Sequence, residues 1–307
     1  MSNNAADKQH QRAIRGYRLL RKIGSGATAN VFKAEKDGQD FALKVFKLNG
    51  KANASTTMQI FNREASFATQ APQDFTARPV ESFVESVENQ QMPCIAYELA
   101  PNGDLFSLIQ KTGSLPEPVM KFYAKQLLTG LHEMHKAGIC HRDLKLENLV
   151  LDADFNLKII DFGLACPIQG EEGSGFCQER VGTTNHMAPE ILLGMRYQPV
   201  TADLFSLGVI FFALFNGVMP FSKADSEDKY YKLIALHKQN LFWAAHEAHY
   251  GDTFSNEFKD LMNLMFAYQP YQRLNLVEVM AHPFFQQETA SQNVVRNEMM
   301  TRKAANI

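Results

Sequence analysis

The ten-residue stretch HRDLKLENLV (141–150) combines acidic, basic and amide side chains in a loop that leads into an apolar segment. Asp143, Lys145 and Asn148 lie two and three residues apart. Phosphoryl transfer needs a carboxylate near the attacking hydroxyl, cations on the phosphates and metal ligands. Asn148 offers a neutral oxygen to Mg²⁺, a hard cation that prefers oxygen ligands. The stretch therefore predicts a phosphoryl-transfer site.

A second candidate metal ligand, Asp161, lies thirteen residues after Asn148, at the end of the apolar run in IIDFGLA (159–165). The ordered motifs HRDLKLEN, DFG (161–163) and MAPE (187–190) resemble those of eukaryotic Ser/Thr protein kinases. HRDLKLEN is most similar to the calmodulin-dependent and AMP-activated kinase-like group. The complete set in this order is far more specific than any single motif.

Other motifs extend the resemblance over residues 17–285. GSGATANV (24–31) is similar to a Gly-rich phosphate-covering loop, and DLFSLG (203–208) to the start of a buried helix. The resemblance implies an α+β, bilobal protein-kinase fold with a cleft between the lobes. A small antiparallel-sheet N-lobe with one helix (17–100) would precede a larger, mainly helical C-lobe (101–285).

The resemblance also implies a role for each residue of the opening motif. Asp143 would orient or deprotonate the substrate hydroxyl, and Lys145 would contact the transferred phosphoryl group. Asn148 and Asp161 would hold Mg²⁺. The donor would be ATP, and the acceptors would be Ser or Thr hydroxyls of protein substrates.

The N-lobe is expected to supply a lysine–carboxylate pair. Lys44 matches the lysine that holds the α- and β-phosphates of ATP. Its partner would lie on the one N-lobe helix, predicted over 55–70 with Ser55 as the candidate N-cap. Glu64 is the only acidic residue between positions 40 and 74, so it is the expected partner.

The nucleotide site follows from the same resemblance. Val31, Ala42 and Val150 would sandwich adenine, the backbone of 98–100 would bond its edge, and Tyr97 would guard the back of the pocket. Period-2 alternation in a strand places Ala42 and Lys44 on one face. The full set of expected nucleotide contacts is Ile23, Gly24, Ser25, Gly26, Val31, Ala42, Lys44, Glu98, Ala100, Asp104, Val150 and Asp161.

Several residues have a plainer interpretation or depart from the family pattern. Taken alone, GSGATANV is a turn, Lys44 a solvated strand lysine and Glu64 a surface helix charge. Asp203 is expected to tether the catalytic loop and Arg273 to pair with Glu190, which are structural roles. The family pattern is broken by Ala29 in place of a third Gly, by Phe205 in place of Trp, and by Asn185–His186 in place of a pair that ends in Tyr.

Two other functions compete with an active Ser/Thr kinase. A pseudokinase would bind nucleotide or act as a scaffold, but Lys44, Asp143, Asn148 and Asp161 are all retained. A small-molecule phosphotransferase would not need the MAPE motif and Lys145, which serve a protein substrate. The sequence therefore favours an active protein kinase.

Two features bear on substrates and regulation. Asp104 and Glu147 match positions that receive an upstream arginine in basophilic relatives, which predicts basic residues before the acceptor; the alternative is that both are solvated acids. Glu179 lies four residues before Thr183, where many relatives are phosphorylated, and is expected to pair with Arg142 and to permit activity without phosphorylation. The alternative is a switch at Ser174, Thr183 or Thr184.

Composition bounds the partners of the chain. Its 307 residues are 45% hydrophobic and 21% charged, with a net charge of −2. This balance gives no general attraction to nucleic acid or to an anionic membrane. The longest apolar run, 204–215, is shorter than the roughly 20 residues of a membrane span and predicts a buried helix. We expect a cytoplasmic or nuclear protein whose regulatory partner the sequence does not name.

The termini and cysteines carry weaker signals. Residues 1–16 are polar and predict a disordered leader. The tail, 286–307, is polar and predicts a frayed end, with a short basic helix that docks back on the chain as the alternative. The four cysteines are expected to be free thiols, and a redox pair of Cys166 and Cys177 is the less favoured interpretation.

Overall fold

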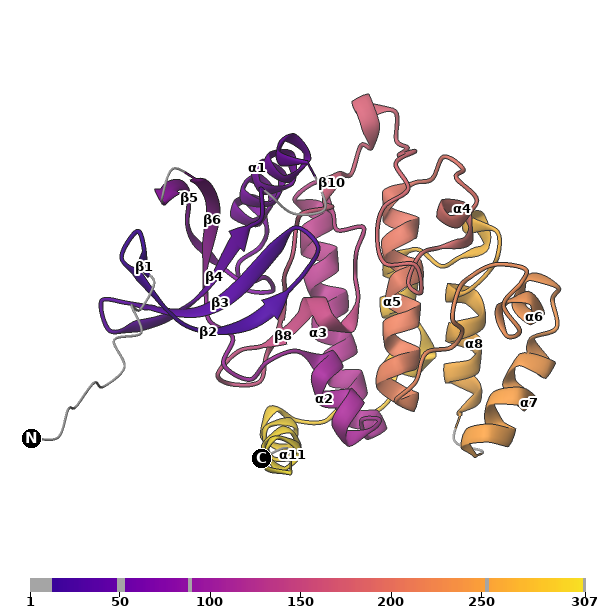
Figure 1. Ribbon diagram of the computed structural model, residues 1–307. Coiled ribbons are helices and arrows are strands. Elements are labelled where there is room, and N and C mark those ends of the chain that lie inside the picture. The colour runs from indigo at the N-terminus through magenta and orange to yellow at the C-terminus, as the bar shows by residue number, and fades with distance from the viewer. Residues whose placement is uncertain (1–12, 49–52, 88–89, 252–253, 306–307) are drawn as a thin grey trace, which may run out of the picture. The chain divides into compact units, whose positions relative to one another are not determined.

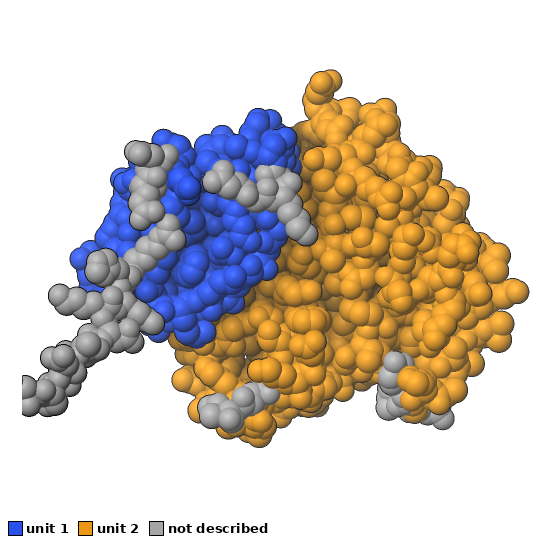
Figure 2. All heavy atoms as spheres, in the orientation of Figure 1, with its two compact units in different colours: residues 1–69, 77–99 blue, residues 70–76, 100–307 orange. Residues whose placement is uncertain are grey.

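The computed structural model describes residues 13–48, 53–87, 90–251 and 254–305. The chain forms two compact units, coloured separately in Figure 2. Unit 1 comprises residues 1–69 and 77–99, and unit 2 comprises residues 70–76 and 100–307.

Segment 70–76 belongs with unit 2, although the sequence placed it in the N-lobe. Its backbone explains the difference. The N–H of Ile159 donates to the carbonyl of Phe75 over 2.8 Å, and Thr76 forms a parallel bridge with Ile159. The segment is therefore an extra strand-like partner for a hairpin of unit 2.

Unit 1 is built on one antiparallel sheet in the order β1-β2-β3-β4-β6-β5 (Figure 1). Its strands are β1 (Ala13–Ile14), β2 (Tyr17–Ser25), β3 (Ala29–Lys36), β4 (Gln39–Phe46), β5 (Pro79–Val87) and β6 (Gln90–Glu98). Residues 88 and 89, between β5 and β6, lie outside the described residues.

The two faces of this sheet have different roles. Leu43 and Val45 of β4 point into a hydrophobic core that also contains Tyr17, Ala34 and Cys94. The alternate residues of β4, Ala42 and Lys44, lie on the other face, as predicted. The core face thus fixes the register that presents Lys44 on the opposite side.

One helix of unit 1, α1 (Ala54–Gln70), provides the partner of Lys44. Its cap is Asn53, whose side-chain oxygen accepts the N–H of Thr56 over 2.7 Å, so the prediction of Ser55 as N-cap is wrong. Phe61 and Glu64 lie on the buried face, three residues apart.

The prediction of a disordered leader over residues 1–16 is wrong for its last residues. Residues 1–12 lie outside the described residues, but Ala13 and Ile14 form β1 and pair with β2. Ile14 is 1% exposed and joins the core of unit 1. Burial of this apolar side chain offsets the entropy lost on ordering the segment.

Unit 2 is mainly helical, with two short two-stranded sheets (Figure 1). The paired strands are β7 (Ile139–Cys140) with β10 (Cys166–Pro167), and β8 (Leu149–Leu151) with β9 (Leu157–Ile159). The helices are α2 (Leu105–Thr112), α3 (Glu117–Lys136), α4 (Pro189–Leu192), α5 (Pro199–Asn216), α6 (Tyr231–Ala235), α7 (Gln239–Tyr250), α8 (Asn256–Met265), α9 (Leu276–Ala281), α10 (Pro283–Gln286) and α11 (Gln292–Ala304).

Helix α5 forms the centre of unit 2, between α3 and α8 (Figure 1). It is long and apolar enough to cross a membrane, but 78% of it is buried inside the protein, as in a core helix. Phe205, which replaces the family's Trp, is fully buried against Phe221, Tyr231 and Phe266. The smaller ring is therefore accommodated by an aromatic cluster.

The tail is not a frayed end, which corrects the favoured prediction. Residues 292–304 form α11, which packs against α2 and α3 (Figure 1). Val295 and Met299, one helical turn apart, are fully buried. The alternative weighed from the sequence, a short basic helix docked on the chain, is confirmed.

Candidate active site

The loop that follows β7, called the catalytic loop, is held in place by the carboxylate of Asp203. Asp203, near the start of α5, accepts the backbone N–H of His141 over 2.9 Å and that of Arg142 over 2.8 Å. Arg142 has a positive φ of 63°, a conformation that costs energy for a non-glycine residue. The two bonds hold that turn in place, which confirms Asp203 as the predicted tether.

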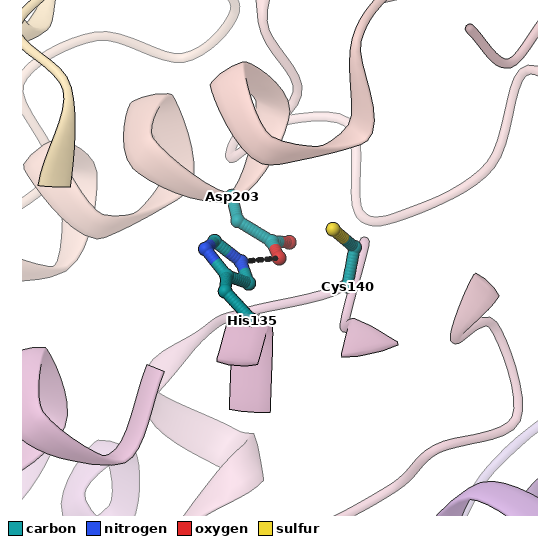
Figure 3. Close-up of side chains that lie close together, drawn as sticks. All are labelled: His135, Cys140 and Asp203. Carbon is teal, nitrogen blue, oxygen red and sulfur yellow. Dashed lines mark hydrogen bonds and ion pairs between the residues drawn. The ribbon is translucent and has the colours of Figure 1, made fainter. Parts of the chain in front are cut away.

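Asp203 also bonds the side chain of His135 in α3, with 3.0 Å between its Oδ2 and the ring Nε2 (Figure 3). Cys140 lies beside them, so the three residues have metal-ligating side chains within 4.8 Å of one another. The carboxylate oxygens already accept three N–H groups, however, and burial raises the pKa of the Cys140 thiol. We interpret this cluster as a structural tether.

The catalytic-loop residues converge on Asp143. Lys145 Nζ donates to Asp143 Oδ2, and the Thr183 hydroxyl donates to Asp143 Oδ1, each over 2.7 Å. Lys145 also donates to Thr183 Oγ1 over 2.7 Å. Thr183 therefore lies beside the Asp–Lys pair, and the three contacts fix the direction of the Asp143 carboxylate.

The predicted metal ligands lie at one end of the β8–β9 hairpin. Leu149 pairs with Ile159, so Asn148 and Ile160 are opposite each other, and the Asn148 carbonyl accepts the Ile160 N–H over 3.0 Å. Asp161 follows directly. Asn148 Nδ2 donates to the Asp143 carbonyl over 2.9 Å, which leaves the amide oxygen as the atom available for a cation.

In unit 1 the predicted pair is formed. Lys44 Nζ lies 2.8 and 2.7 Å from the two carboxylate oxygens of Glu64. The Glu64 side chain is 1% exposed and that of Lys44 11% exposed, so the pair is shielded from water. The interpretations of Lys44 as a solvated lysine and of Glu64 as a surface charge are wrong.

The Gly-rich turn between β2 and β3 is closed by the Gly26 N–H, which donates to the Ala29 carbonyl over 2.9 Å. Ala29 begins β3 opposite Phe46 of β4 and is 4% exposed, so the residue in place of a third glycine is shielded from solvent.

The other expected nucleotide contacts are divided between the units. Ile23, Val31, Ala42 and Glu98 belong to unit 1, while Ala100, Asp104 and Val150 belong to unit 2. The backbone N–H of Glu98 already donates to the Arg78 carbonyl over 3.0 Å.

Asp104 has a structural role that the sequence did not indicate. Its carboxylate oxygens accept the N–H and the hydroxyl of Ser107 over 2.7 and 2.8 Å, so it is the N-cap of α2. Asp104 also forms an antiparallel bridge with Val150 of β8.

The segment from Asp161 to Glu190, called the activation segment, is bonded to Arg142. This guanidinium donates to Glu179 Oε2 over 3.1 Å and to the Leu164 carbonyl over 2.7 Å. The Tyr197 hydroxyl donates to the Glu179 carbonyl over 2.9 Å. Glu179 thus contacts Arg142 as predicted, although its side chain remains 48% exposed.

Arg273 and Glu190 form a buried, bidentate pair with two N–O distances of 2.7 Å, as predicted. His186, the residue directly before the MAPE motif, is buried, and burial lowers its pKa to about 4. Cys166 and Cys177 are buried free thiols whose sulfur atoms are 3.7 Å apart. No sequence signal indicated the environment of His186, whereas the spacing of Cys166 and Cys177 suggested their proximity.

Comparisons with known proteins agree with this geometry. The protein kinase domain family matches residues 17–285. CBL-interacting protein kinase 30 of Oryza sativa subsp. japonica is 33% identical over 92% of this chain and 56% of its own length. CBL-interacting serine/threonine-protein kinase 16 of Arabidopsis thaliana is 29% identical over 88% of this chain and 56% of its own. Probable serine/threonine-protein kinase MARK-B of Dictyostelium discoideum is 31% identical over 91% and 38%. This chain thus spans little more than half the length of the plant relatives.

Proposed function

The chain belongs to the protein kinase domain family, and we propose that it is an active enzyme that transfers the γ-phosphate of ATP to Ser or Thr hydroxyls of protein substrates. The observation that carries the proposal is the triangle of Asp143, Lys145 and Thr183, with three contacts of 2.7 Å. It presents one oriented carboxylate beside one cation, the arrangement that phosphoryl transfer requires.

Asp143 would accept the proton of the substrate hydroxyl or hold that hydroxyl in line for attack. Its carboxylate is oriented by Lys145 and Thr183, and its backbone carbonyl accepts Asn148 Nδ2, so little rearrangement is needed at the moment of reaction. The Lys145 ammonium group would contact the transferred phosphoryl group and stabilise its negative charge.

The donor set of unit 2 fits a magnesium ion. Asn148 and Asp161 bring an amide oxygen and a carboxylate to the same end of one hairpin, and hard divalent cations prefer such oxygens. The bound ion would neutralise charge on the phosphates of ATP. In unit 1, Lys44, fixed by Glu64, would hold the α- and β-phosphates.

A pseudokinase scaffold is not supported. The chain retains all four residues that the activity would require: Lys44, Asp143, Asn148 and Asp161. Lys44 bonds Glu64, Asp143 bonds Lys145, and the other two flank the paired strands β8 and β9. A protein lacking catalysis would have no need of these four side chains together.

The decisive experiment follows radiolabelled phosphate from ATP and Mg²⁺ onto a Ser/Thr peptide. Asp143→Asn is expected to lower the rate by about 10²–10⁴-fold, because the amide cannot accept the hydroxyl proton. Asp154→Asn, in the exposed turn between β8 and β9, is the matched control and is expected to retain the full rate. Equal transfer by wild type and Asp143→Asn would contradict the proposal.

We further propose a preference for basic residues upstream of the acceptor. Glu147 is exposed next to the catalytic loop, and the Asp104 carboxylate, although it caps α2, is only partly buried. A peptide library should show Arg or Lys enriched before the phosphorylated residue. Glu147→Gln should weaken that selection about tenfold at one upstream position, and a library with no basic selection by the wild type would refute the preference.

We also propose that Glu179 replaces an activating phosphate. Its 3.1 Å contact with Arg142 is the contact that a phosphate would make at this position, although a carboxylate carries less charge. The enzyme would therefore be active without phosphorylation of the activation segment.

A further inference from the structure

We propose that Tyr97 is a positioning residue for the reaction, acting through Glu64 on Lys44. The Tyr97 hydroxyl donates to Glu64 Oε1 over 2.9 Å, inside unit 1. The role expected for Tyr97 at the back of the nucleotide pocket needs only a bulky side chain, so it does not account for the hydroxyl. The inference rests on the proposed function, because it assigns Lys44 the task of holding phosphate.

Strand register places Tyr97 beside the pair. Tyr97 of β6 is directly opposite Ala42 of β4, and Ile95 is opposite Lys44. Residues that face each other across antiparallel strands share a sheet face, so Tyr97 and Lys44 project on the same side, away from the core. Glu64 reaches this face from α1, and the three side chains meet there.

The hydrogen bonds form a three-group network with Glu64 at its centre. Oε1 accepts from both Tyr97 and Lys44, and Oε2 also accepts from Lys44. A carboxylate has about four acceptor sites, so the two donors on Oε1 do not compete. Tyr97 therefore fixes the carboxylate independently of the lysine.

The bond from Tyr97 to Glu64 matters when Lys44 binds phosphate. Lys44 has three N–H donors, and two contacts in this structure go to Glu64. When Lys44 turns part of its ammonium group toward phosphate, its hold on Glu64 weakens. Tyr97 then keeps the buried carboxylate in place, so that the lysine remains aimed and the carboxylate does not lose its partners in a site that excludes water.

Unit 1 contains a matched control for this inference. Tyr17, 1% exposed, donates its hydroxyl to Glu81 Oε1 over 2.7 Å. Both tyrosines are buried, both lie in the same sheet and both bond a glutamate. Tyr17, however, faces the core opposite to the Lys44 face, so loss of its hydroxyl tests stability alone.

The first test measures steady-state phosphorylation of a Ser/Thr peptide by wild type, Tyr97→Phe and Tyr17→Phe. Tyr97→Phe is expected to lower kcat/KM for ATP about tenfold, the factor that corresponds to one hydrogen bond to a charged group. Tyr17→Phe is expected to change it less than twofold. Thermal unfolding midpoints of both variants verify that each is folded. Equal rates for wild type and Tyr97→Phe, or equal losses in the two variants, would overturn the inference.

The second test is a double-mutant cycle with Glu64→Gln. If Tyr97 acts through Glu64, Tyr97→Phe should cost less than twofold in the Glu64→Gln background, although it costs about tenfold in the wild type. A tenfold loss in both backgrounds would show that the Tyr97 hydroxyl acts independently of the Glu64 carboxylate and would overturn the inference. The proposed function fails separately: an inactive wild type, or one unaffected by Asp143→Asn, overturns both.

Discussion

At the scale of single residues, Arg142 links the catalytic loop to the activation segment, and its contact with Glu179 predicts how the enzyme is switched on. The guanidinium is buried, with its side chain 3% exposed, so a partner for its charge is needed whether or not the segment is phosphorylated. Glu179 supplies that partner from the chain itself.

We therefore expect enzyme made in bacteria and treated with phosphatase to phosphorylate peptide. Glu179→Gln should lower its kcat about tenfold, because the neutral amide no longer compensates the buried guanidinium and the segment loses order. Glu172→Gln, on the same segment but away from Arg142, serves as the control and should retain the rate. An inert phosphatase-treated wild type would show that the carboxylate does not substitute for phosphate.

Single-residue predictions succeeded where the sequence left one candidate. Glu64 was identified because no other acidic residue lies in the helix region, and Arg273 and Asp203 because the motif fixes their partners. The bond from Tyr97 to Glu64 could not be predicted, since it depends on strand register and on the depth of α1. The N-cap role of Asp104 in α2 was not predicted, although an Asp directly before an apolar run is a typical N-cap residue.

At the scale of elements, α11 shows how a terminal helix is stabilised by bonds to other helices. Arg302 donates to the Thr112 hydroxyl over 2.8 Å and to the carbonyls of Gly113 and Ser114 over 3.1 and 2.8 Å. Thr112 is the last residue of α2, and Gly113 and Ser114 begin the connection to α3. The arginine therefore bonds carbonyl groups at and just after the C-terminal end of the helix, where intrahelical donors are lacking.

Arg302→Ala is expected to lower the free energy of unfolding by about 1–2 kcal/mol, because the partly buried Thr112 hydroxyl and the carbonyls of Gly113 and Ser114 lose a charged donor. Arg296→Ala is the matched control on the same helix. Arg296 is 52% exposed and makes a 3.4 Å contact with Asp154, so its loss should cost less than about 0.5 kcal/mol. Urea denaturation followed by Trp243 fluorescence measures both, and equal effects would contradict the assigned role of Arg302.

The sequence predicted the major elements because their periodicity is strong, as in the apolar run of α5. It did not favour α11, whose apolar signal consists of little more than Val295 and Met299 in a polar segment. Whether such a segment is ordered depends on the surface it meets. That surface is formed by α2 and the start of α3, nearly two hundred residues earlier in the chain.

At the scale of the whole molecule, the order of motifs predicted the fold class and the α+β division, because each motif carries its place in a known architecture. The stability of the fold as a function of pH is a property that the motifs do not contain. It depends on histidines that are buried uncharged, and unit 2 has two with clearly lowered pKa values, His186 and His246.

Burial lowers the pKa of each to about 4, against about 6.5 in an unfolded chain. Between these values the unfolded state binds protons that the folded state does not. Stability is therefore fully present above pH 6.5 and is lost as the pH falls toward 4, by up to about 1.4 kcal/mol per pH unit for each histidine. Carboxylates with lowered pKa values, such as Glu35 and Glu171, contribute mainly below this window.

His246→Phe tests this linkage. The ring contacts Phe212 and Phe242, and phenylalanine preserves that aromatic packing while removing the titrating group. The variant should be less stable at pH 7, because the Pro220 carbonyl loses its bond, yet its stability should fall less steeply between pH 6.5 and 4.5. Phe285→Leu, which disturbs the packing against Phe211, lowers stability without removing a proton site, so its slope should match the wild type. If His246→Phe retained the wild-type slope, protonation of this histidine would not be what destabilises the fold in acid.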